Sequence, residues 1–185
     1  MIAEKTGRYE SVNLYCEDEA RFGLFTCVGK GLTARGVKPV CPFQQVFQYT
    51  YLFGAYSPIN GDHFELELPF CNSDMFQRYL DEFSQHKPKE LKVVVLDNGA
   101  FHKAKRLVIP DNILLMFLPP YSPELNPAEK IWWSMKRGYV NRLFDNLDQL
   151  SDYIANAVIG LTKMEVTSIC AFDYFKPAQN HWVIL

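Results

Sequence analysis

The first third of the chain alternates between apolar and polar residues, which is the pattern of β-strands. This pattern predicts three strands, at residues 11–25, 46–57 and 63–70, with a turn joining the second strand to the third. Side chains alternate across a strand, so the consecutive acids at positions 17–19 cannot all face the same side. If both faces of the sheet are covered, alternation alone does not select a functional acid.

After residue 70 the apolar positions recur with the 3.6-residue period of helices, interrupted by two apolar runs. These runs, at residues 91–96 and 113–118, predict buried strands. The order β-β-β-α-β-α-β-α-α predicts an α/β fold with a mixed sheet and helices on both faces. The helices are predicted as one capped by Asn72 or Ser73, a short one at 102–107, one that opens at Asn126-Pro127, and one from Asn146 to Leu161.

The stretch LPPYSPELNPAEKIWWSMK joins a proline-rich loop to the start of a helix. Asn126 is a good N-cap residue, and Pro127 suits the first helical position. The pattern predicts a carboxylate at the helix start, beside two aromatic anchors. A capping box, in which Glu129 reaches back to the Asn126 amide, explains the local pattern equally well. One helix face is shared by residues with i, i+3, i+4, i+7 spacing: Glu129, Trp132, Trp133 and Lys136.

A second candidate acid, Asp97, follows the apolar run at residues 91–96. In open α/β sheets, functional residues gather at the carboxyl ends of strands, which is where Asp97 is expected. The sequence Asp97-Asn98-Gly99 is also a common turn, and this reading needs no function.

Three blocks of the chain together resemble the catalytic blocks of DDE transposases, in particular bacterial insertion-sequence members of the mariner superfamily. YCEDEARFGL resembles the first block, VVVLDNGAFHKAK the second, and LPPYSPELNPAEKIWWSMK the third. The blocks follow the family order and extend over most of the chain. The resemblance implies that residues 1–185 form a single RNase H-like catalytic domain with a mixed five-stranded sheet, and the predicted element order agrees with that fold.

The resemblance also implies the catalytic residues. It identifies Asp18 in the first block, and Asp97 and Glu129 in the other two, as the catalytic acids and metal ligands. The cofactor implied is Mg²⁺ or Mn²⁺, with two ions bound, since hard cations take carboxylate oxygens as ligands. The implied reaction is hydrolytic cleavage at transposon ends, followed by attack of the freed 3′-hydroxyl on target DNA.

Accessory and DNA-binding residues are expected near these acids. His102 and Asn98 lie in a D-N-G-x-F-H context, where His102 is expected either to orient water or phosphate or to cap and pack. Basic residues follow the second and third blocks, and they are expected either to contact DNA or to form solvated helix faces. They are Lys103, Lys105, Lys136 and Arg137. The implied partners are transposon-end and target DNA, with a homodimer assembled on the DNA.

Composition narrows this picture. The chain has 185 residues, of which 48% are hydrophobic, and this suits one globular domain. Its net charge of -2 argues against strong DNA affinity by this chain alone. Five scattered cysteines, without a C-x-x-C pair, predict neither a zinc knuckle nor a disulfide framework. No membrane span, signal peptide or small-molecule cofactor is predicted, and a bacterial cytoplasmic location, at the nucleoid when active, is expected.

Two departures from the family pattern keep other functions open. Family members carry helix-turn-helix modules upstream, whereas this chain begins almost at the first catalytic strand. The turn at residues 36–39 has no tryptophan nearby, so a DNA-end contact cannot be assigned to it. The alternatives are a non-catalytic or domesticated remnant that binds DNA or protein, and a structure-selective RNase H-like nuclease. The aromatic tail at residues 172–185 is expected to dock on a partner chain.

Overall fold

The computed structural model describes residues 7–30 and 33–175. Its centre is a five-stranded sheet with the order β3-β2-β1-β4-β5. The central strand β1 runs antiparallel to β2 and parallel to β4, so the predicted mixed sheet is confirmed. The strands are β1 (Ser11–Gly23), β2 (Tyr49–Tyr56), β3 (His63–Leu68), β4 (Glu90–Leu96) and β5 (Ile113–Phe117).

The central strand changes its pairing along its length, and this change positions the functional residues. From Ser11 to Cys16 it pairs with β4, and from Cys16 to Gly23 it pairs with β2. The ladder to β4 therefore ends directly before the three acids at positions 17–19. Beyond this point β1 and β4 are no longer hydrogen-bonded, so their separation leaves room beside β1 at the carboxyl end of β4.

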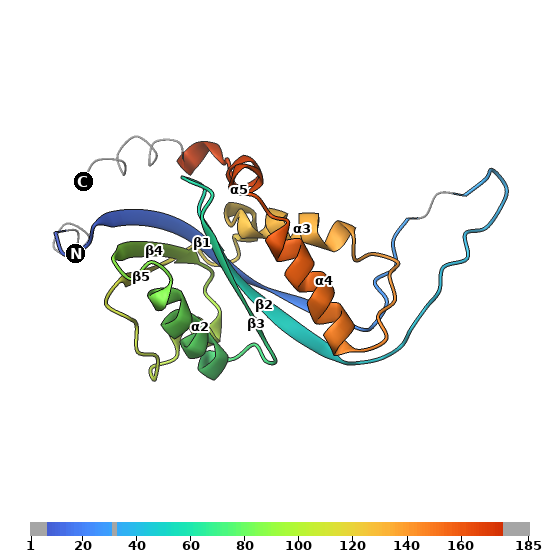
Figure 1. The fold of residues 1–185 in the computed structure, drawn as a ribbon, viewed down its shortest axis with the longest axis horizontal. Helices are drawn as coiled ribbons and strands as arrows, with labels where there is room; N and C mark the ends of the chain where they lie inside the picture. The colour runs from blue at the N-terminus through green and yellow to red at the C-terminus, as the bar shows by residue number, and fades with distance from the viewer. Residues whose placement is uncertain (1–6, 31–32, 176–185) are drawn as a thin grey trace.

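Helices cover both faces of the sheet, as predicted (Figure 1). On one face α2 packs through its aromatic stripe, which includes Phe76 and Tyr79, against Tyr15 of β1 and Phe53 of β2. On the other face α3, α4 and α5 share a second core with the sheet. The helices are α2 (Ser73–Gln85), α3 (Ala128–Arg137), α4 (Leu147–Ile159) and α5 (Lys163–Ile169), with 3₁₀ turns η1 (Ala100–Lys103), η2 (Pro123–Leu125) and η3 (Asp173–Phe175).

Several predicted boundaries were wrong. The last predicted helix, Asn146 to Leu161, corresponds to α4 and ends two residues early, at Ile159; the helix that follows, α5, starts at a capping box at Thr162 and was not predicted. The helix predicted at 102–107 is instead the 3₁₀ turn η1. The N-cap of α2 is Asn72, whose side chain accepts hydrogen bonds from two backbone amides of the first turn.

The connection from β1 to β2 is a long arm, residues 24–48, that projects from the sheet (Figure 1). A turn lies near its tip at residues 34–37, where the Val37 amide donates to the Ala34 carbonyl and Gly36 has a φ of 86°; this is two residues before the turn expected at 36–39. The start of the C-terminal tail, through Phe175, packs on the chain's own β1 and β4. The remainder of the tail, residues 176–185, lies outside the described residues, so its predicted docking is untested. No helix in the described ranges is long and apolar enough to cross a membrane.

Candidate active site

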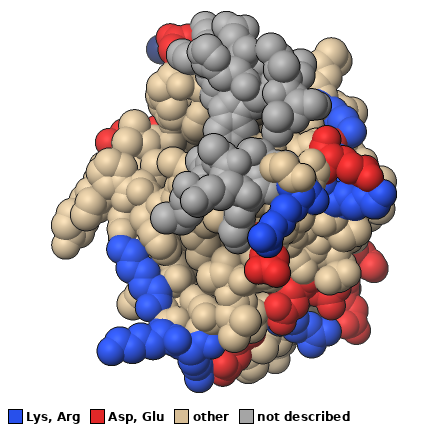
Figure 2. Space-filling model, turned by 90° about the vertical axis from the view of Figure 1, so that its left-hand side faces the viewer, with Lys and Arg blue, Asp and Glu red and all other residues tan. Residues whose placement is uncertain are grey.

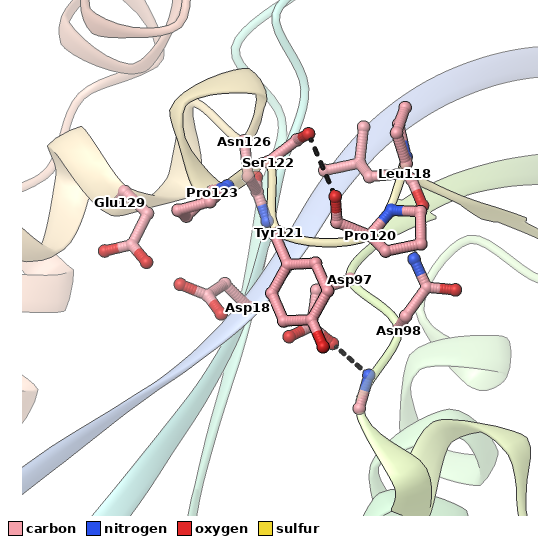
Figure 3. Close-up of a pocket in the computed structure, with 12 residues that line it drawn as sticks. Asp18, Asp97, Asn98, Leu118, Pro120, Tyr121, Ser122, Pro123, Asn126 and Glu129 are labelled. Carbon is pink, nitrogen blue, oxygen red and sulfur yellow. Dashed lines mark hydrogen bonds between the residues drawn. The ribbon is translucent and has the colours of Figure 1, made fainter.

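The structure brings the three predicted acids to one pocket of about 470 Å³. Asp18 comes from β1, Asp97 from the loop after β4, and Glu129 from the first turn of α3. Figure 3 shows the Glu129 carboxylate beside that of Asp18, with Asp97 on the other side of the opening. The proline-rich loop at residues 118–123 and Asn126 complete the lining. The pocket lies where β1 and β4 part.

Asp18 is held in place by a tryptophan of α3. The indole Nε1 of Trp132 donates a hydrogen bond of 2.9 Å to Asp18 Oδ2, which leaves the other carboxylate oxygen for a ligand. Burial, reinforced by the charges of Glu19 and Glu129, raises the pKa of Asp18 from 3.8 to about 7. A cation in the pocket would relieve this repulsion.

A glycine opposite Asp18 makes room for this arrangement. Gly54 of β2 pairs with Asp18 across the ladder. A Cβ at Gly54 would lie 2.6 Å from the Trp132 ring and 2.5 Å from the Tyr56 hydroxyl. The tryptophan can therefore reach Asp18 only because position 54 has no side chain. The sequence analysis did not single out Gly54. A glycine inside a strand often marks a close approach by another group, and this could have pointed to it.

Asp97 is fixed on one side and open on the other. Its Oδ1 accepts hydrogen bonds from the Gly99 amide, at 2.7 Å, and from His102 Nδ1, at 2.9 Å. A Cβ at Gly99 would lie 3.0 Å from Asp97 Oδ1 and 3.0 Å from His102 Nδ1, so a larger residue there would crowd this hydrogen bond. The side chain of Asp97 is nevertheless 60% exposed to solvent. Asp97-Asn98-Gly99 therefore does form a turn, as its sequence suggests. The turn uses Oδ1 of Asp97 and leaves Oδ2 available for a ligand.

The predicted accessory residue Asn98 holds the pocket together. Its amide donates to the Leu118 carbonyl, and Lys103 donates to its side-chain oxygen. These bonds join the end of β4 to the proline-rich loop. Asn98 therefore shapes the opening in which Asp97 and Glu129 lie.

Glu129 is exposed in the first turn of α3, and the capping-box interpretation was wrong. The Asn126 amide donates to the Pro123 carbonyl instead of to Glu129. The helix begins one residue later than predicted, with Pro127 and not Asn126 at the N-cap. The Asn126 side chain accepts from the Ala128 amide and donates to the Glu17 carbonyl at 2.8 Å, which ties the helix start to β1.

Only one of the two predicted aromatic anchors is an anchor. Trp132 is 3% exposed and packs in the core, whereas Trp133 is 68% exposed, with the Arg137 guanidinium 5.2 Å from its ring centre. Consecutive helix residues are about 100° apart, so only one of the pair can face the sheet.

A buried polar cluster lies on the other face of β1, and sequence reasoning did not find it. Glu17 is 1% exposed, and neither of its carboxylate oxygens has a hydrogen-bond partner. His102 Nε2 lies 2.9 Å from Glu19 Oε1 and 3.9 Å from Glu17 Oε2. Among the residues that the structure describes, this trio is the group of possible metal ligands whose atoms all lie within 4.8 Å.

Electrostatics in this cluster follow from burial and close contacts. Burial, with the nearby charges of Glu19 and Asp18, raises the pKa of Glu17 well above its usual range. Burial lowers the pKa of His102, but hydrogen bonding and the charges of Glu19 and Asp97 outweigh it, so the net shift is upward. His102 is buried and contacts Asp97, which agrees with the packing role, while a role in orienting water or phosphate stays a prediction.

The predicted DNA-binding residues lie at two places outside the pocket. Lys103 and Lys105 line a neighbouring groove along β5. Lys136 and Arg137 lie in the last turn of α3, far along the helix from Glu129. On the face shown in Figure 2, basic side chains lie among acidic ones. The geometry leaves the DNA contacts a prediction.

The donors in the pocket fit a hard divalent cation. All three acids offer carboxylate oxygens, which are the ligands that Mg²⁺ and Mn²⁺ take in proteins. Asp18 keeps one oxygen free beside Trp132, and Asp97 keeps Oδ2 free beside Gly99 and His102. The upward pKa shift of Asp18 has the sign expected of a site built for a positive charge.

Solved structures of Mos1 transposase share this fold. A Mos1 transposase paired-end complex with left transposon end matches 98% of this chain and 55% of the Mos1 chain, with a TM-score of 0.68 and 14% identity. The catalytic domain of Mos1 mariner transposase matches 96% of this chain and 82% of that domain, with a TM-score of 0.60 and 13% identity. These matches confirm the RNase H-like fold. The chain spans about half the length of the Mos1 chain in the paired-end complex.

Sequence comparisons agree with this fold. The uncharacterized protein y4pE/y4sA of Sinorhizobium fredii is 39% identical over 104 residues, which are 55% of this chain and 77% of that protein. The family of DDE superfamily endonucleases matches residues 13–151, well over half of the chain. The resemblance to DDE enzymes is confirmed, while the insertion-sequence subtype stays a prediction. The chain belongs to the DDE superfamily endonucleases.

Proposed function

We propose that this chain is the catalytic domain of a DNA transposase, which cleaves DNA at transposon ends and transfers the freed strand to target DNA. The observation that supports this proposal most is the convergence of Asp18, Asp97 and Glu129, from three separate sequence blocks, on one open pocket. Membership of the DDE endonucleases supports phosphodiester cleavage as the reaction. A strand transfer complex among the Mos1 structures of the same fold supports the second step.

In this proposal the three acids hold two Mg²⁺ or Mn²⁺ ions. Mos1 paired-end complexes with Mn and with Mg have the same fold, which supports this choice of metals. When bound, such ions activate a water or a 3′-hydroxyl and stabilise the leaving oxygen. No small-molecule cofactor takes part.

The protein's own contribution is to fix the carboxylates. Trp132 holds one oxygen of Asp18, while Gly99 and His102 hold one oxygen of Asp97. Each acid then presents its remaining oxygen in a set direction, and this limits the motion of the ligand set. His102 acts here as a positioning residue, because it contacts the acid and not the substrate.

The substrate and assembly follow from the same proposal. Residues 1–185 form a single RNase H-like catalytic domain that works on DNA as a homodimer in a bacterial cytoplasm. The DNA backbone is contacted by Lys103, Lys105, Lys136 and Arg137. With a net charge of -2, the domain binds DNA weakly without a recognition module.

The decisive experiment is a plasmid-nicking assay with Mg²⁺ or Mn²⁺ on DNA that carries inverted repeats. Glu129→Ala should lower the nicking rate at least about a hundredfold, and Glu124→Ala, an exposed acid in the preceding turn, should leave it unchanged. Equal nicking by Glu129→Ala would remove Glu129 from the catalytic set. Nicking confined to branched or hairpin DNA, with linear duplex left intact, would support a structure-selective nuclease, and an inactive native chain would support the remnant.

A further inference from the structure

The cluster of Glu17, Glu19 and His102 lies on the α2 side of β1, away from the pocket of Asp18. The His102 ring packs against Phe76 of α2, with ring centroids 4.5 Å apart, which places the cluster beneath that helix. Glu17 and Glu19 face this side because side chains of β1 alternate between the two faces. None of the three residues lines the pocket of the catalytic acids.

Glu17 is the anomaly in this cluster. Its side chain is fully buried, and both carboxylate oxygens lack a hydrogen-bond partner. A buried carboxylate without a partner is strongly unfavourable, so it must take up a proton or a cation. The atoms nearest to it that could share a cation belong to His102 and Glu19.

The geometry of the cluster matches a metal site more closely than a simple ion pair. His102 Nδ1 lies 2.9 Å from Asp97 Oδ1, so this nitrogen donates to a carboxylate. Its other nitrogen, Nε2, faces the two glutamates, 2.9 Å from Glu19 and 3.9 Å from Glu17. A carboxylate that holds the far nitrogen of a ligating histidine is the usual outer support of metal sites.

The donor set selects the class of cation. One imidazole and two carboxylates suit Mn²⁺, Fe²⁺ or Zn²⁺ better than Mg²⁺, which prefers oxygen ligands alone. A route for entry exists, since His102 lines the groove of about 540 Å³ along β5. The Glu19 side chain is also 10% exposed.

We propose that Glu17, Glu19 and His102 bind one divalent transition-metal cation, such as Mn²⁺ or Zn²⁺, at a site separate from the catalytic pocket. Asp97 supports this site through His102 while its other oxygen faces the pocket. The cation therefore braces the turn that carries Asp97. The site stands on its own residues and does not depend on the proposed transposase reaction.

The test uses the full chain with the pocket acids neutralised, as Asp18→Asn combined with Glu129→Gln. After dialysis against Zn²⁺ this protein should retain about one ion per chain, measured by elemental analysis, and Mg²⁺ should not compete for it. Adding Glu17→Gln should weaken Zn²⁺ binding at least tenfold, and so should adding His102→Gln. The matched control Glu82→Gln, an exposed acid on α2, should leave binding unchanged.

Thermal melting gives a second readout that does not depend on activity. Zn²⁺ at about a hundred times its Kd should raise the Tm of the parent by several degrees, and Glu17→Gln should abolish that rise. A cooperative melt in EDTA shows that Glu17→Gln is folded. Failure of the parent to retain Zn²⁺ would overturn the proposal and assign Glu17 a proton. Undiminished binding in Glu17→Gln would also overturn it, by placing the ion elsewhere.

Discussion

The two faces of β1 carry acids of the same kind in opposite surroundings. On the pocket face, Asp18 meets an opening of about 470 Å³. On the α2 face, neither carboxylate oxygen of Glu17 has a hydrogen-bond partner, and Glu19 contacts the buried His102. The difference arises because the β4 ladder ends at Cys16, which opens one face of the strand while α2 closes the other. The end of the β4 ladder and the cover by α2, and not the type of acid, decide which acid lines an open pocket.

The largest expected effect separates the two faces by activity. Asp18→Asn should reduce metal-dependent nicking at least about a hundredfold, because it removes a ligand charge at the pocket. Glu17→Gln should change the rate by less than about tenfold, since Glu17 is on the closed face. Rates measured with Mn²⁺ on one plasmid substrate test this. If Glu17→Gln is as inactive as Asp18→Asn, the two faces form one site and the comparison fails.

A second effect concerns the packing that holds the pocket face. Gly54→Ala should displace the Trp132 ring from Asp18, because the new Cβ would lie 2.6 Å from it. We expect a loss of about 1–3 kcal/mol in the free energy of unfolding, as for overpacked cores, together with slower nicking. Gly7→Ala is the control, since a Cβ there meets no atom within 4 Å. Denaturant melts of both variants measure the loss, and an unchanged Gly54→Ala protein would show that Trp132 can move freely.

The free energy of unfolding should depend on pH through an acid on each face of β1, Asp18 and Glu17. The pKa of Asp18 rises from 3.8 to about 7 on folding, so the folded chain keeps a proton that the unfolded chain releases. The free energy of unfolding should therefore fall as pH rises from about 4 to 7, in EDTA. Glu17 has an upward pKa shift of the same sign, so its contribution should also decrease with rising pH, from its unfolded value upward.

Two variants separate these contributions. Asp18→Asn should flatten the fall between about pH 4 and 7, and Glu17→Gln should flatten the fall that begins at its unfolded pKa of 4.5. Thermal melts across this pH range give the measurement. A native chain whose stability rises over this window would contradict the raised pKa of both acids.

The smallest effect concerns DNA. Lys103→Ala combined with Lys105→Ala should reduce the salt slope of DNA binding by about two, because two phosphate contacts are lost. The same holds for Lys136→Ala combined with Arg137→Ala. Fluorescence anisotropy at several salt concentrations tests both pairs. A pair whose loss leaves the slope unchanged is a solvated surface, and the other pair then marks the path of the DNA.

Much of the pocket could be predicted from the sequence because its acids lie in three ordered blocks. The mixed five-stranded sheet and the convergence of Asp18, Asp97 and Glu129 followed from those blocks, although the catalytic roles of the acids stay a prediction. The helical spacing gave a wrong prediction where a buried and an exposed residue both fit it. Trp132 and Trp133 look alike in sequence, and only the contact of α3 with the sheet separates them.

The buried cluster could not have been predicted in the same way. Alternation places Glu17 opposite Asp18 but does not say what covers that face, and the cover comes from α2 and from a histidine 85 residues later in the chain. The end of α4 did have a signal, because Gly160 stands directly after its last residue, Ile159. Leu161 fits the apolar spacing of the helix, so the prediction extended the helix past this glycine.

The alternation of β1 also constrains how this chain can change in length. Deleting one residue between Val12 and Cys16 would exchange the faces of every later side chain in the strand, so Asp18 would turn under α2 and its neighbours would enter the pocket. A two-residue change would restore the faces but shift the ladder with β2, and Gly54 would no longer stand opposite Asp18. We therefore expect homologues to vary freely in the length of the 24–48 arm and hardly at all in the length of this strand.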